Sequence, residues 1–246
     1  MKNVQHKAAL VTGGSRGIGA AIAKRLGRNG THVAITYHTS AAQAEEVVRT
    51  IRESGVKAIA IRADSKDPQA VTTAVKQAYE YLGSLDILVN NAGIAVYKDF
   101  SLFTLEDFDR IVAVNVRAIF AGSLEAIKYM GQGGRIIHIG SCQAERNPFP
   151  GGSLYAMSKS ALTGLTKGMA RDLGPKGITV NVVHPGPVNT DMNPSDGVHS
   201  DDQRALLALR DYATTEDIAS LVAFLASSES SNITGAGLVS DGGTSI

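Results

Sequence analysis

Short apolar runs alternate with segments of helical periodicity along nearly the whole chain, and this alternation constrains the fold more than any other feature. Uninterrupted apolar runs such as Ile87-Leu88-Val89 are typical of strands buried on both faces, because a half-exposed strand alternates apolar and polar residues. We therefore predict an α/β fold, a doubly wound parallel sheet with helices on both faces. Strands are expected at 8–11, 33–36, 58–61, 87–89, 136–139, 179–183 and 238–240, and helices at 20–28, 41–54, 67–81, 105–130, 154–173 and 215–226.

No linker, repeat or low-complexity tract divides the 246 residues, so residues 1–246 are predicted to form a single domain. One segment, 185–202, is too rich in Pro, Gly, Asp, Ser and Asn to be helix or strand throughout. Long irregular loops in compact domains are usually functional, and we expect a substrate lid at about 186–205. Thr215 is expected to cap the helix that follows.

Composition excludes several classes of protein. With 24 basic and 23 acidic side chains, the net charge of +1 gives no reason to expect nucleic acid or an anionic membrane surface. No window approaches the length of apolar chain that spans a membrane, and the polar start from Met1 to Lys7 shows no signal peptide. We expect a cytoplasmic protein. A single cysteine, Cys142, and six histidines without ligand spacing predict neither a disulfide framework nor a metal site.

The run TGGSRGIG, residues 12–19, lies between the first expected strand and the first expected helix. Glycines at 13, 17 and 19 permit a tight turn and let phosphate oxygens approach the amides at the start of a helix. A tight strand–helix turn without a ligand is the plainer interpretation. Its place as the first turn of an alternating chain favours dinucleotide binding, although the spacing GxxxGxG differs from the common GxGxxG.

The position that reads the adenosine ribose should follow the second strand, where the sequence has Tyr37, His38, Thr39 and Ser40. A carboxylate there would accept a hydrogen bond from the free 2′-hydroxyl of NAD and repel a 2′-phosphate. Its absence, with Arg16 in the glycine turn, favours NADP(H). The alternative is that Arg16 is only a solvated turn residue.

Tyr155 and Lys159 are four residues apart in a helical segment and therefore lie on one helix face. An ammonium close to a phenol would lower the phenol pKa toward the range useful for acid–base catalysis. Such a pair also occurs by chance on surface helices. Ser141 strengthens the catalytic interpretation, since it follows the strand 136–139 at its carboxyl end, where open α/β sheets bind ligands.

These motifs together resemble the short-chain dehydrogenase/reductase family in order and spacing. The matching residues are TGGSRGIG, Asn90-Asn91-Ala92-Gly93, Asn115, Ser141, YAMSK at 155–159, Pro185-Gly186 and the terminal Asp-Gly-Gly, so the likeness covers essentially the whole chain. The likeness is greatest to the 3-oxoacyl-carrier-protein reductase and carbonyl reductase branch. It implies a Rossmann-type fold, an NADP-dependent oxidoreductase that reduces a ketone or 3-oxoacyl group, and a homotetramer.

The resemblance also implies a role for each matching residue. Tyr155 would donate the proton to the carbonyl oxygen, Ser141 would bind that oxygen, Lys159 would lower the phenol pKa and hold the nicotinamide ribose, and Asn115 would hold a water that links Lys159 to solvent. Thr190 would lie near the carboxamide. The full set expected to bind cofactor is Gly13, Ser15, Arg16, Gly17, Ile18, Gly19, Tyr37, His38, Thr39, Ser40, Ala63, Asp64, Ser65, Asn91, Ala92, Gly93, Tyr155, Lys159, Pro185, Gly186, Val188 and Thr190.

Two departures from the family pattern concern the substrate. The interval from Ser141 to Tyr155 is one residue longer than is usual, which we expect to reshape the substrate pocket. The stretch 130–135 is poor in charge, which disfavours an acidic carrier protein as the substrate. Two alternatives stay open: an NAD(P)-dependent dehydrogenase of a secondary alcohol or sugar, and a sensor that binds a nucleotide without turnover.

Overall fold

A computed structural model describes residues 6–246 of the chain. Residues 1–5 lie outside this part. They belong to the polar segment Met1 to Lys7, on which the prediction of no signal peptide rests. The strands and helices are β1 (Ala8–Val11), α1 (Gly17–Arg28), β2 (His32–Tyr37), α2 (Ala41–Arg52), β3 (Ala58–Arg62), α3 (Pro68–Leu82), β4 (Ile87–Asn90), α4 (Leu105–Val112), α5 (Ala118–Ala126), β5 (Arg135–Ile139), α6 (Ser153–Leu173), β6 (Thr179–Pro185), α7 (Ser200–Leu206), α8 (Thr215–Ala226) and β7 (Gly237–Ser240).

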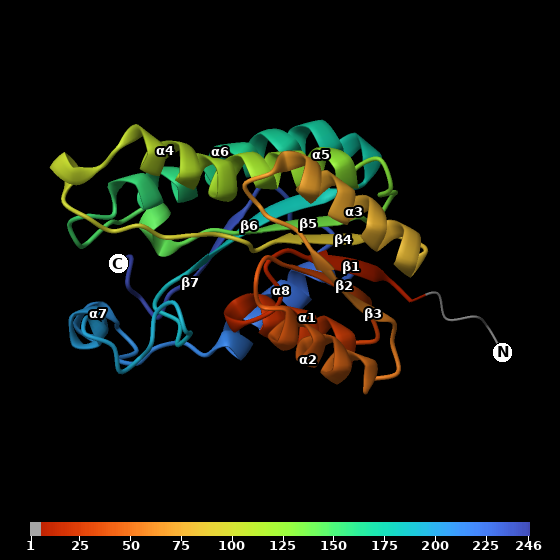
Figure 1. Ribbon diagram of the computed structural model, residues 1–246, viewed down its shortest axis with the longest axis horizontal. Coiled ribbons are helices and arrows are strands. Elements are labelled where there is room, and N and C mark those ends of the chain that lie inside the picture. The colour runs from red at the N-terminus through yellow and green to blue at the C-terminus, as the bar shows by residue number, and fades with distance from the viewer. Residues whose placement is uncertain (1–5) are drawn as a thin grey trace.

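The seven strands form one sheet in the order β3-β2-β1-β4-β5-β6-β7, and every neighbouring pair is parallel. The order reverses between β1 and β4, which is the topological switch point of a doubly wound sheet. Helices α1, α2 and α8 lie on one side of the sheet, and α3, α4, α5 and α6 lie on the other (Figure 1). The predicted Rossmann-type architecture is confirmed.

Strand β1 shows why the apolar runs are uninterrupted. Its successive side chains point to opposite faces, so Ala9 and Val11 pack against α1, α2 and α8, while Ala8 and Leu10 pack against α3, α5 and α6. All four are fully buried. Two separate cores therefore require apolar residues at every position of a central strand.

The long helix expected at 105–130 is wrong in two respects. It ends at Ala126, and its course is not α-helical throughout. It is interrupted by a π-helical turn, Ala113–Arg117, in which the amide of Ala118 bonds the oxygen of Ala113, five residues back. Periodicity misses this turn because one extra residue displaces the apolar pattern only slightly. Asn115 is the middle residue of this turn.

The expected cap of the last helix is also corrected. Thr214, rather than Thr215, caps α8: its hydroxyl accepts the amide of Asp217, whose carboxylate accepts the amide of Thr214. This reciprocal capping box needs an acid three residues after the cap, and only Thr214 has that spacing to Asp217.

Two features are absent from residues 6–246. None of the helices in that range is both long enough and apolar enough to cross a bilayer. Within the same range no three His, Cys, Asp or Glu side chains gather in a way that could hold a metal ion.

Candidate active site

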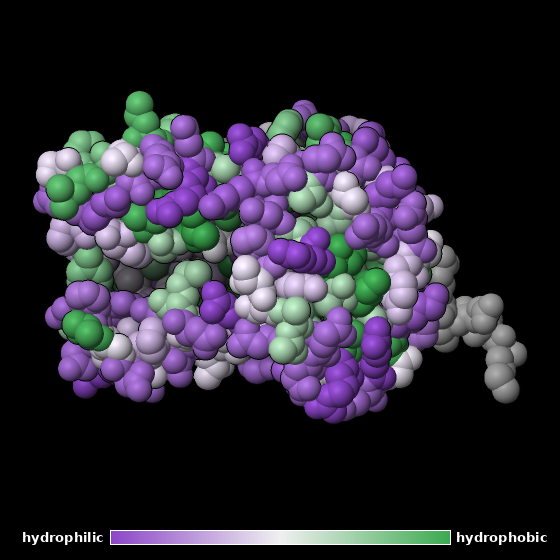
Figure 2. All heavy atoms as spheres, viewed as in Figure 1, coloured by the Kyte–Doolittle hydropathy of each residue, from purple (hydrophilic) through white to green (hydrophobic). Residues whose placement is uncertain are grey.

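A cavity of about 990 Å³ lies along the carboxyl ends of the strands. The molecule is hollowed between the part that carries α4 and the part that carries α7 (Figure 2), and residues from α7 and from the loop after β4 line the cavity. All the residues expected to bind cofactor line it, as do Ser141, Tyr155 and Lys159. Of the sequence-predicted residues only Asn115, which is fully buried, does not.

The glycine turn is shaped for a close approach to phosphate. Gly13 and Gly17 have φ angles of 63° and 54°, which L-residues rarely adopt, and the amide of Gly13 bonds the hydroxyl of Thr36. A side chain at Gly19 would collide with the main-chain oxygen of Gly13. No side chain caps the start of α1 and no acid lies in its first turn. These amides therefore fit an anion such as the pyrophosphate of a dinucleotide.

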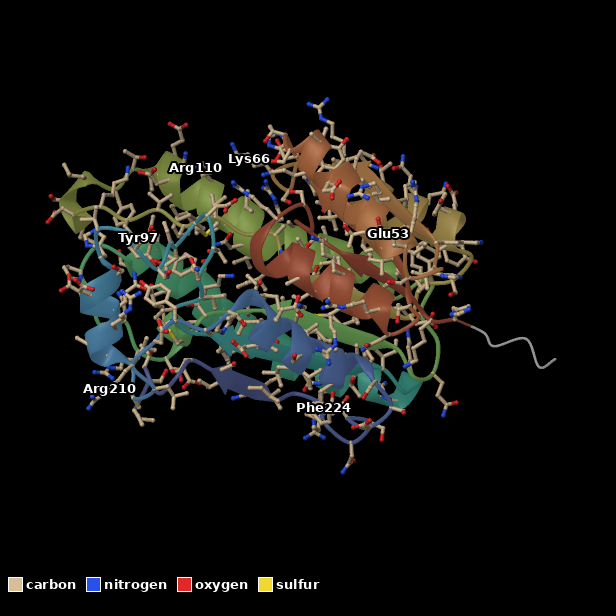
Figure 3. The ribbon with its side chains drawn as sticks, turned by 90° about the horizontal axis from the view of Figure 1, so that it is seen from below. Glu53, Lys66, Tyr97, Arg110, Arg210 and Phe224 are labelled. Atoms are coloured by element: carbon tan, nitrogen blue, oxygen red, sulfur yellow. The ribbon has the colours of Figure 1, made fainter. Side chains whose placement is uncertain are left out.

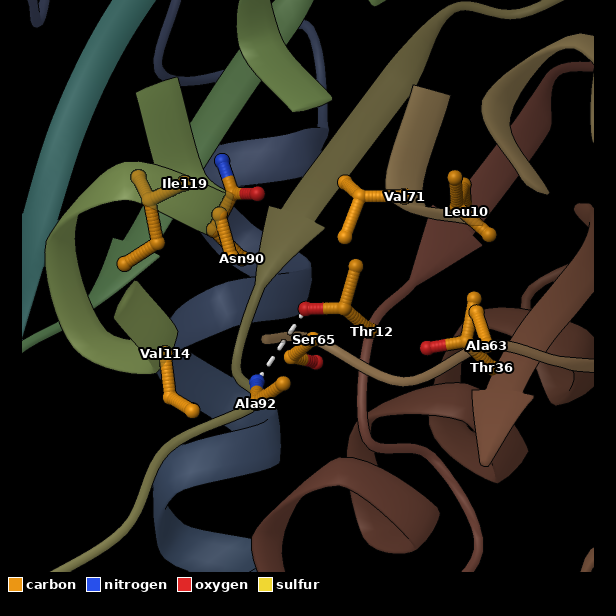
Figure 4. A pocket seen from close by; sticks show the side chains of 11 residues that line it. Leu10, Thr12, Thr36, Ala63, Ser65, Val71, Asn90, Ala92, Val114 and Ile119 are labelled. Atoms are coloured by element: carbon orange, nitrogen blue, oxygen red, sulfur yellow. Dashed lines mark hydrogen bonds between the residues drawn. The ribbon is translucent and has the colours of Figure 1, made fainter. Parts of the chain in front are cut away.

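Thr12 and Asn91 join the glycine turn to the segment after β4. The hydroxyl of Thr12 accepts the amides of Asn91 and Ala92 at 3.0 and 3.1 Å, and the side-chain amide of Asn91 donates to the oxygens of Thr12 and Gly13. The contact between Thr12 and Ala92 lies beside a small cavity of about 10 Å³, room for one water (Figure 4). The two walls of the cofactor site are thus joined by hydrogen bonds between side chains and main chain.

At the expected adenosine end, charges are exposed and only loosely paired. Arg16 lies 3.8 Å from Asp191 of the 186–205 segment, and the two side chains are 59% and 64% exposed. His38 lies 3.6 Å from Asp64. Such exposed pairs contribute little to stability, so these side chains are available to a ligand phosphate or adenine.

Ser141 and Tyr155 meet at the other end of the cavity. Ser141 follows β5, and its hydroxyl oxygen accepts the amide of Gln143 at 3.2 Å, which leaves its proton free to donate. The short turn Cys142–Ala144 begins there and takes up part of the longer interval to Tyr155. Burial raises the pKa of Tyr155, and a hydrogen bond with Ser141 opposes the rise only in part. The phenol is therefore protonated at neutral pH.

Lys159 differs from expectation in where its ammonium is directed. Its Nζ donates to the main-chain oxygen of Ile139 at 2.8 Å and lies 5.7 Å from the centroid of the Tyr155 ring. Burial lowers the pKa of Lys159 to about 8. Burial is the main cause of the raised phenol pKa, and the ammonium of Lys159, which bonds a carbonyl oxygen, is not among the groups that shift it.

Asn115 forms a buried bridge between two walls of the site. Its side-chain oxygen accepts the amide of Ile94 at 2.9 Å, and its side-chain nitrogen donates to the oxygen of Ile94 and to the hydroxyl of Ser158. Ser158 in turn donates to the main-chain oxygen of Tyr155. Asn115 and Lys159 both lie near Gly93, since a Cβ on Gly93 would meet Oδ1 and Nζ at 3.4 and 3.6 Å.

Several cavity residues were missed by sequence reasoning. The ring of Tyr97 lies 5.9 Å from that of Tyr155, and its hydroxyl donates to Gln143. Tyr97 lies at the same end of the molecule as α7 (Figure 3). Phe149, His199 and Gln203 also line the cavity. No spacing signal points to these residues because they lie on irregular loops and a short helix, brought together only by folding.

The chain matches known proteins over nearly its whole length. A family model described as Enoyl-(Acyl carrier protein) reductase matches residues 13–245. A short-chain dehydrogenase from Burkholderia cenocepacia, solved in complex with NADP, is 55% identical, with a TM-score of 0.97 and 100% of each chain covered.

Two curated relatives carry different names. The cyclic-di-GMP-binding biofilm dispersal mediator protein of Escherichia coli is 44% identical over 96% of both chains. Versicolorin reductase stcU of Emericella nidulans is 40% identical over 96% of this chain and 95% of the relative. The fold, the glycine turn, and the common cavity of Ser141, Tyr155 and Lys159 agree with these likenesses. The chain belongs to the short-chain dehydrogenase/reductase family of oxidoreductases.

Proposed function

We propose that the protein is an NADPH-dependent reductase that converts the carbonyl of a ketone or 3-oxoester to a secondary alcohol. The observation that carries the proposal is the single cavity that joins the glycine turn to Ser141, Tyr155 and Lys159. NADPH supplies the hydride when it is bound. The protein residues supply binding, orientation and the proton.

The residues around the cavity support NADP(H) over NAD(H). No carboxylate occupies 37–40, and Arg16 is exposed at the start of α1 and available to a 2′-phosphate. Neighbouring proteins in the family were solved with NADP or NADPH. In this proposal the residues expected from the sequence hold the cofactor, with Asp64 at the adenine and Thr190 at the carboxamide.

The catalytic roles follow from the states of the side chains. Tyr155, kept protonated by burial, donates the proton to the carbonyl oxygen, and this favours the reductive direction. Ser141 donates its free hydroxyl proton to the same oxygen. Lys159 holds the ribose as a cation below pH 8, and Asn115 keeps the wall at Ile94 in place for the water that would connect Lys159 to solvent.

The lining around Ser141 favours a small neutral substrate. Tyr97, Gln143, Phe149 and Met192 give apolar and uncharged polar contacts, and Asp202 adds a negative charge. Lysine and arginine among the lining residues are confined to Arg16, Lys66 and the buried Lys159. No exposed lysine or arginine of the cavity lining lies near Ser141 to bind an acidic carrier protein or an anionic thioester. The free ester or ketone is therefore the better substrate. The segment 186–205 would close over it as a lid.

The experiment is NADPH consumption with a panel of 3-oxoesters and aryl ketones, with NADH in parallel and Tyr155→Phe as the control. We expect turnover with NADPH that Tyr155→Phe reduces by at least about a hundredfold, since a general acid contributes about 10²–10⁴-fold. A faster oxidation of secondary alcohols with NAD would favour the dehydrogenase alternative. Tight NADPH binding with no turnover on any carbonyl would overturn the reductase proposal.

A second candidate function is a nucleotide sensor. The relative named as cyclic-di-GMP-binding is 44% identical over 96% of this chain, and the cavity is large enough for a dinucleotide. A sensor would bind cyclic-di-GMP in competition with NADPH and give no turnover. Displacement of NADPH, followed by cofactor fluorescence, separates the two candidates.

We further propose a cytoplasmic homotetramer. Helices α4 and α5 expose large apolar side chains at Leu105, Phe108, Phe120 and Leu124 on the side of the sheet away from α1 and α8. A patch of this kind is typical of an interface between subunits. Light scattering during gel filtration should give four times the mass of one chain, and cell fractionation should place the protein with soluble enzymes.

A further inference from the structure

The side chain of His184 contacts the main chain of Ser141. It is the sixth residue of β6, it is fully buried, and its Nδ1 lies 3.0 Å from the main-chain oxygen and 3.3 Å from the main-chain nitrogen of Ser141. The ring fits a space left by two glycines. A Cβ on Gly140 would come within 2.5 Å of Nδ1, and one on Gly237 within 3.2 Å of Nε2.

The ladder between β5 and β6 ends where this contact begins. The last paired residues are Ile139 and Val183, and the amide of Gly140 bonds the oxygen of Val183 at 2.7 Å. Beyond that point Pro185 has no N–H with which to continue the ladder. At this point the imidazole of His184, rather than a main-chain hydrogen bond of the ladder, connects β6 to Ser141.

The hydrogen bonds favour one tautomer of this ring. Burial lowers the pKa of His184, so the ring is neutral and carries one N–H. Within residues 6–246 Nε2 has no hydrogen-bond partner. Nδ1 lies closer to the main-chain oxygen of Ser141, at 3.0 Å, than to its main-chain nitrogen, at 3.3 Å. Only a protonated Nδ1 can donate to that oxygen, so the geometry places the proton on Nδ1.

We propose that His184, protonated at Nδ1, is a positioning residue that fixes the main chain of Ser141 and thereby its hydroxyl. The catalytic consequence rests on the proposed reductase function, whereas the structural one does not. Ser141 has an extended backbone and starts the short turn Cys142–Ala144. Without His184 the side chain of Ser141 would keep its hydrogen bonds with Gln143 and Tyr155, but its main chain would lose the contact to β6.

The first test needs no turnover. In protein labelled with ¹⁵N-histidine, the His184 nitrogens should show a protonated Nδ1 and an unprotonated Nε2; the opposite tautomer would overturn the proposal. Crystal structures of His184→Leu and His184→Asn should show Ser141 displaced in the first and retained in the second, because an asparagine amide can donate to the Ser141 oxygen. An unmoved Ser141 in His184→Leu also contradicts the proposal.

The second test is a double-mutant cycle with Ser141→Ala. Loss of a donor to a developing oxyanion costs about 10²–10³ in kcat, which is the effect expected of Ser141→Ala. His184→Leu should lower kcat about 10- to 100-fold, as misplacement of a catalytic group does, with NADPH affinity unchanged. In the Ser141→Ala background His184→Leu should cause no further loss, and His184→Asn should restore most of kcat in the wild-type background.

The matched control is His138→Leu. His138 is also fully buried, lies on the adjacent strand β5 and bonds Asn90 rather than Ser141. His138→Leu should lower stability and kcat by the same factor in the wild-type background as in the Ser141→Ala background. If His184→Leu also lowers kcat by the same factor in both backgrounds, His184 acts only through the packing of the core, and the positioning role is refuted. Absence of turnover in the wild type would refute the reductase proposal alone, because tautomer and crystal structures still decide the placement of Ser141.

Discussion

The ammonium of Lys159 donates a hydrogen bond to the main-chain oxygen of Ile139, the last residue of β5. Lys159 is 5% exposed, and among the described residues burial is the only cause that shifts the pKa of its ammonium, with no carboxylate contributing. A carbonyl oxygen compensates only part of the lost hydration of an ammonium. The native state therefore binds the proton of Lys159 less tightly than the unfolded chain does.

This relationship predicts how stability depends on pH. The pKa of Lys159 is about 8 in the folded protein and 10.5 ordinarily. Below pH 8 both states hold the proton and the cost of the buried charge is fully present. Between pH 8 and 10.5 the unfolded state binds more protons, so the free energy of unfolding rises with pH. The full effect is about 3 kcal/mol, from 1.36 kcal/mol for each pKa unit.

Urea denaturation of wild type and Lys159→Met without cofactor, from pH 7 to 10, checks this prediction at fixed protein concentration. As pH rises, the unfolding free energy of the wild type should increase relative to that of Lys159→Met. All other titrating groups are common to the two proteins, so their effects cancel in this difference. A difference that stays constant over this interval would contradict it.

Substitution of Asn115 should destabilise the fold as well as the site. Asn115→Ala removes three hydrogen bonds, two with Ile94 and one with Ser158, and takes from the amide and the oxygen of Ile94 the partner they have in Asn115. At about 1 kcal/mol each, the loss in unfolding free energy is about 3 kcal/mol. Asn232→Ala is the control, because Asn232 is exposed and its loss should stay within about 0.5 kcal/mol. Equal effects of the two substitutions in urea denaturation would argue against the bridge.

Removal of the guanidinium at Arg16 should weaken NADPH binding and leave NADH binding unchanged. A hydrogen bond to a charged group contributes about 1.5–3 kcal/mol, so the Kd for NADPH should rise about 10- to 100-fold in Arg16→Ala. Arg28→Ala, at the other end of α1 and paired with Glu216, is the matched control. Fluorescence titration with both cofactors gives the comparison. Parallel losses for NADH and NADPH would mean that Arg16 does not read the 2′-phosphate.

A methyl group at Gly19 should destroy the cofactor site. The added Cβ would overlap the oxygen of Gly13 and the side chain of Asn91, so the turn must open. We expect loss of measurable NADPH binding together with a lower Tm. Gly168→Ala is the control on α6, where a Cβ meets nothing within 4 Å. There alanine should stabilise the helix by about 0.5–1 kcal/mol. Normal NADPH binding by Gly19→Ala would contradict the proposed phosphate cradle.

Local sequence patterns are sufficient to predict the order of the elements and the principal site. Apolar runs without alternation require a sheet buried on both faces, and Ala9 and Leu10 show this on opposite sides of β1. The glycine turn and the four-residue spacing of Tyr155 and Lys159 are local patterns. Their place at the carboxyl ends of strands follows from the parallel topology. These features depend on residues close in sequence, which is why they could be predicted.

Other features of the site depend on contacts between segments that are distant in the sequence. The π-helical turn that presents Asn115 is stabilised by contacts to Ile94 and Ser158, and neither contact has a signature in spacing. The pKa of Tyr155 rises because burial in the folded protein disfavours the charged phenolate, although the helix spacing to Lys159 alone predicts a fall. His184 anchors Ser141 only because β5 and β6 are neighbours. Desolvation and long-range hydrogen bonds are set by packing, and packing is fixed only when the whole chain folds.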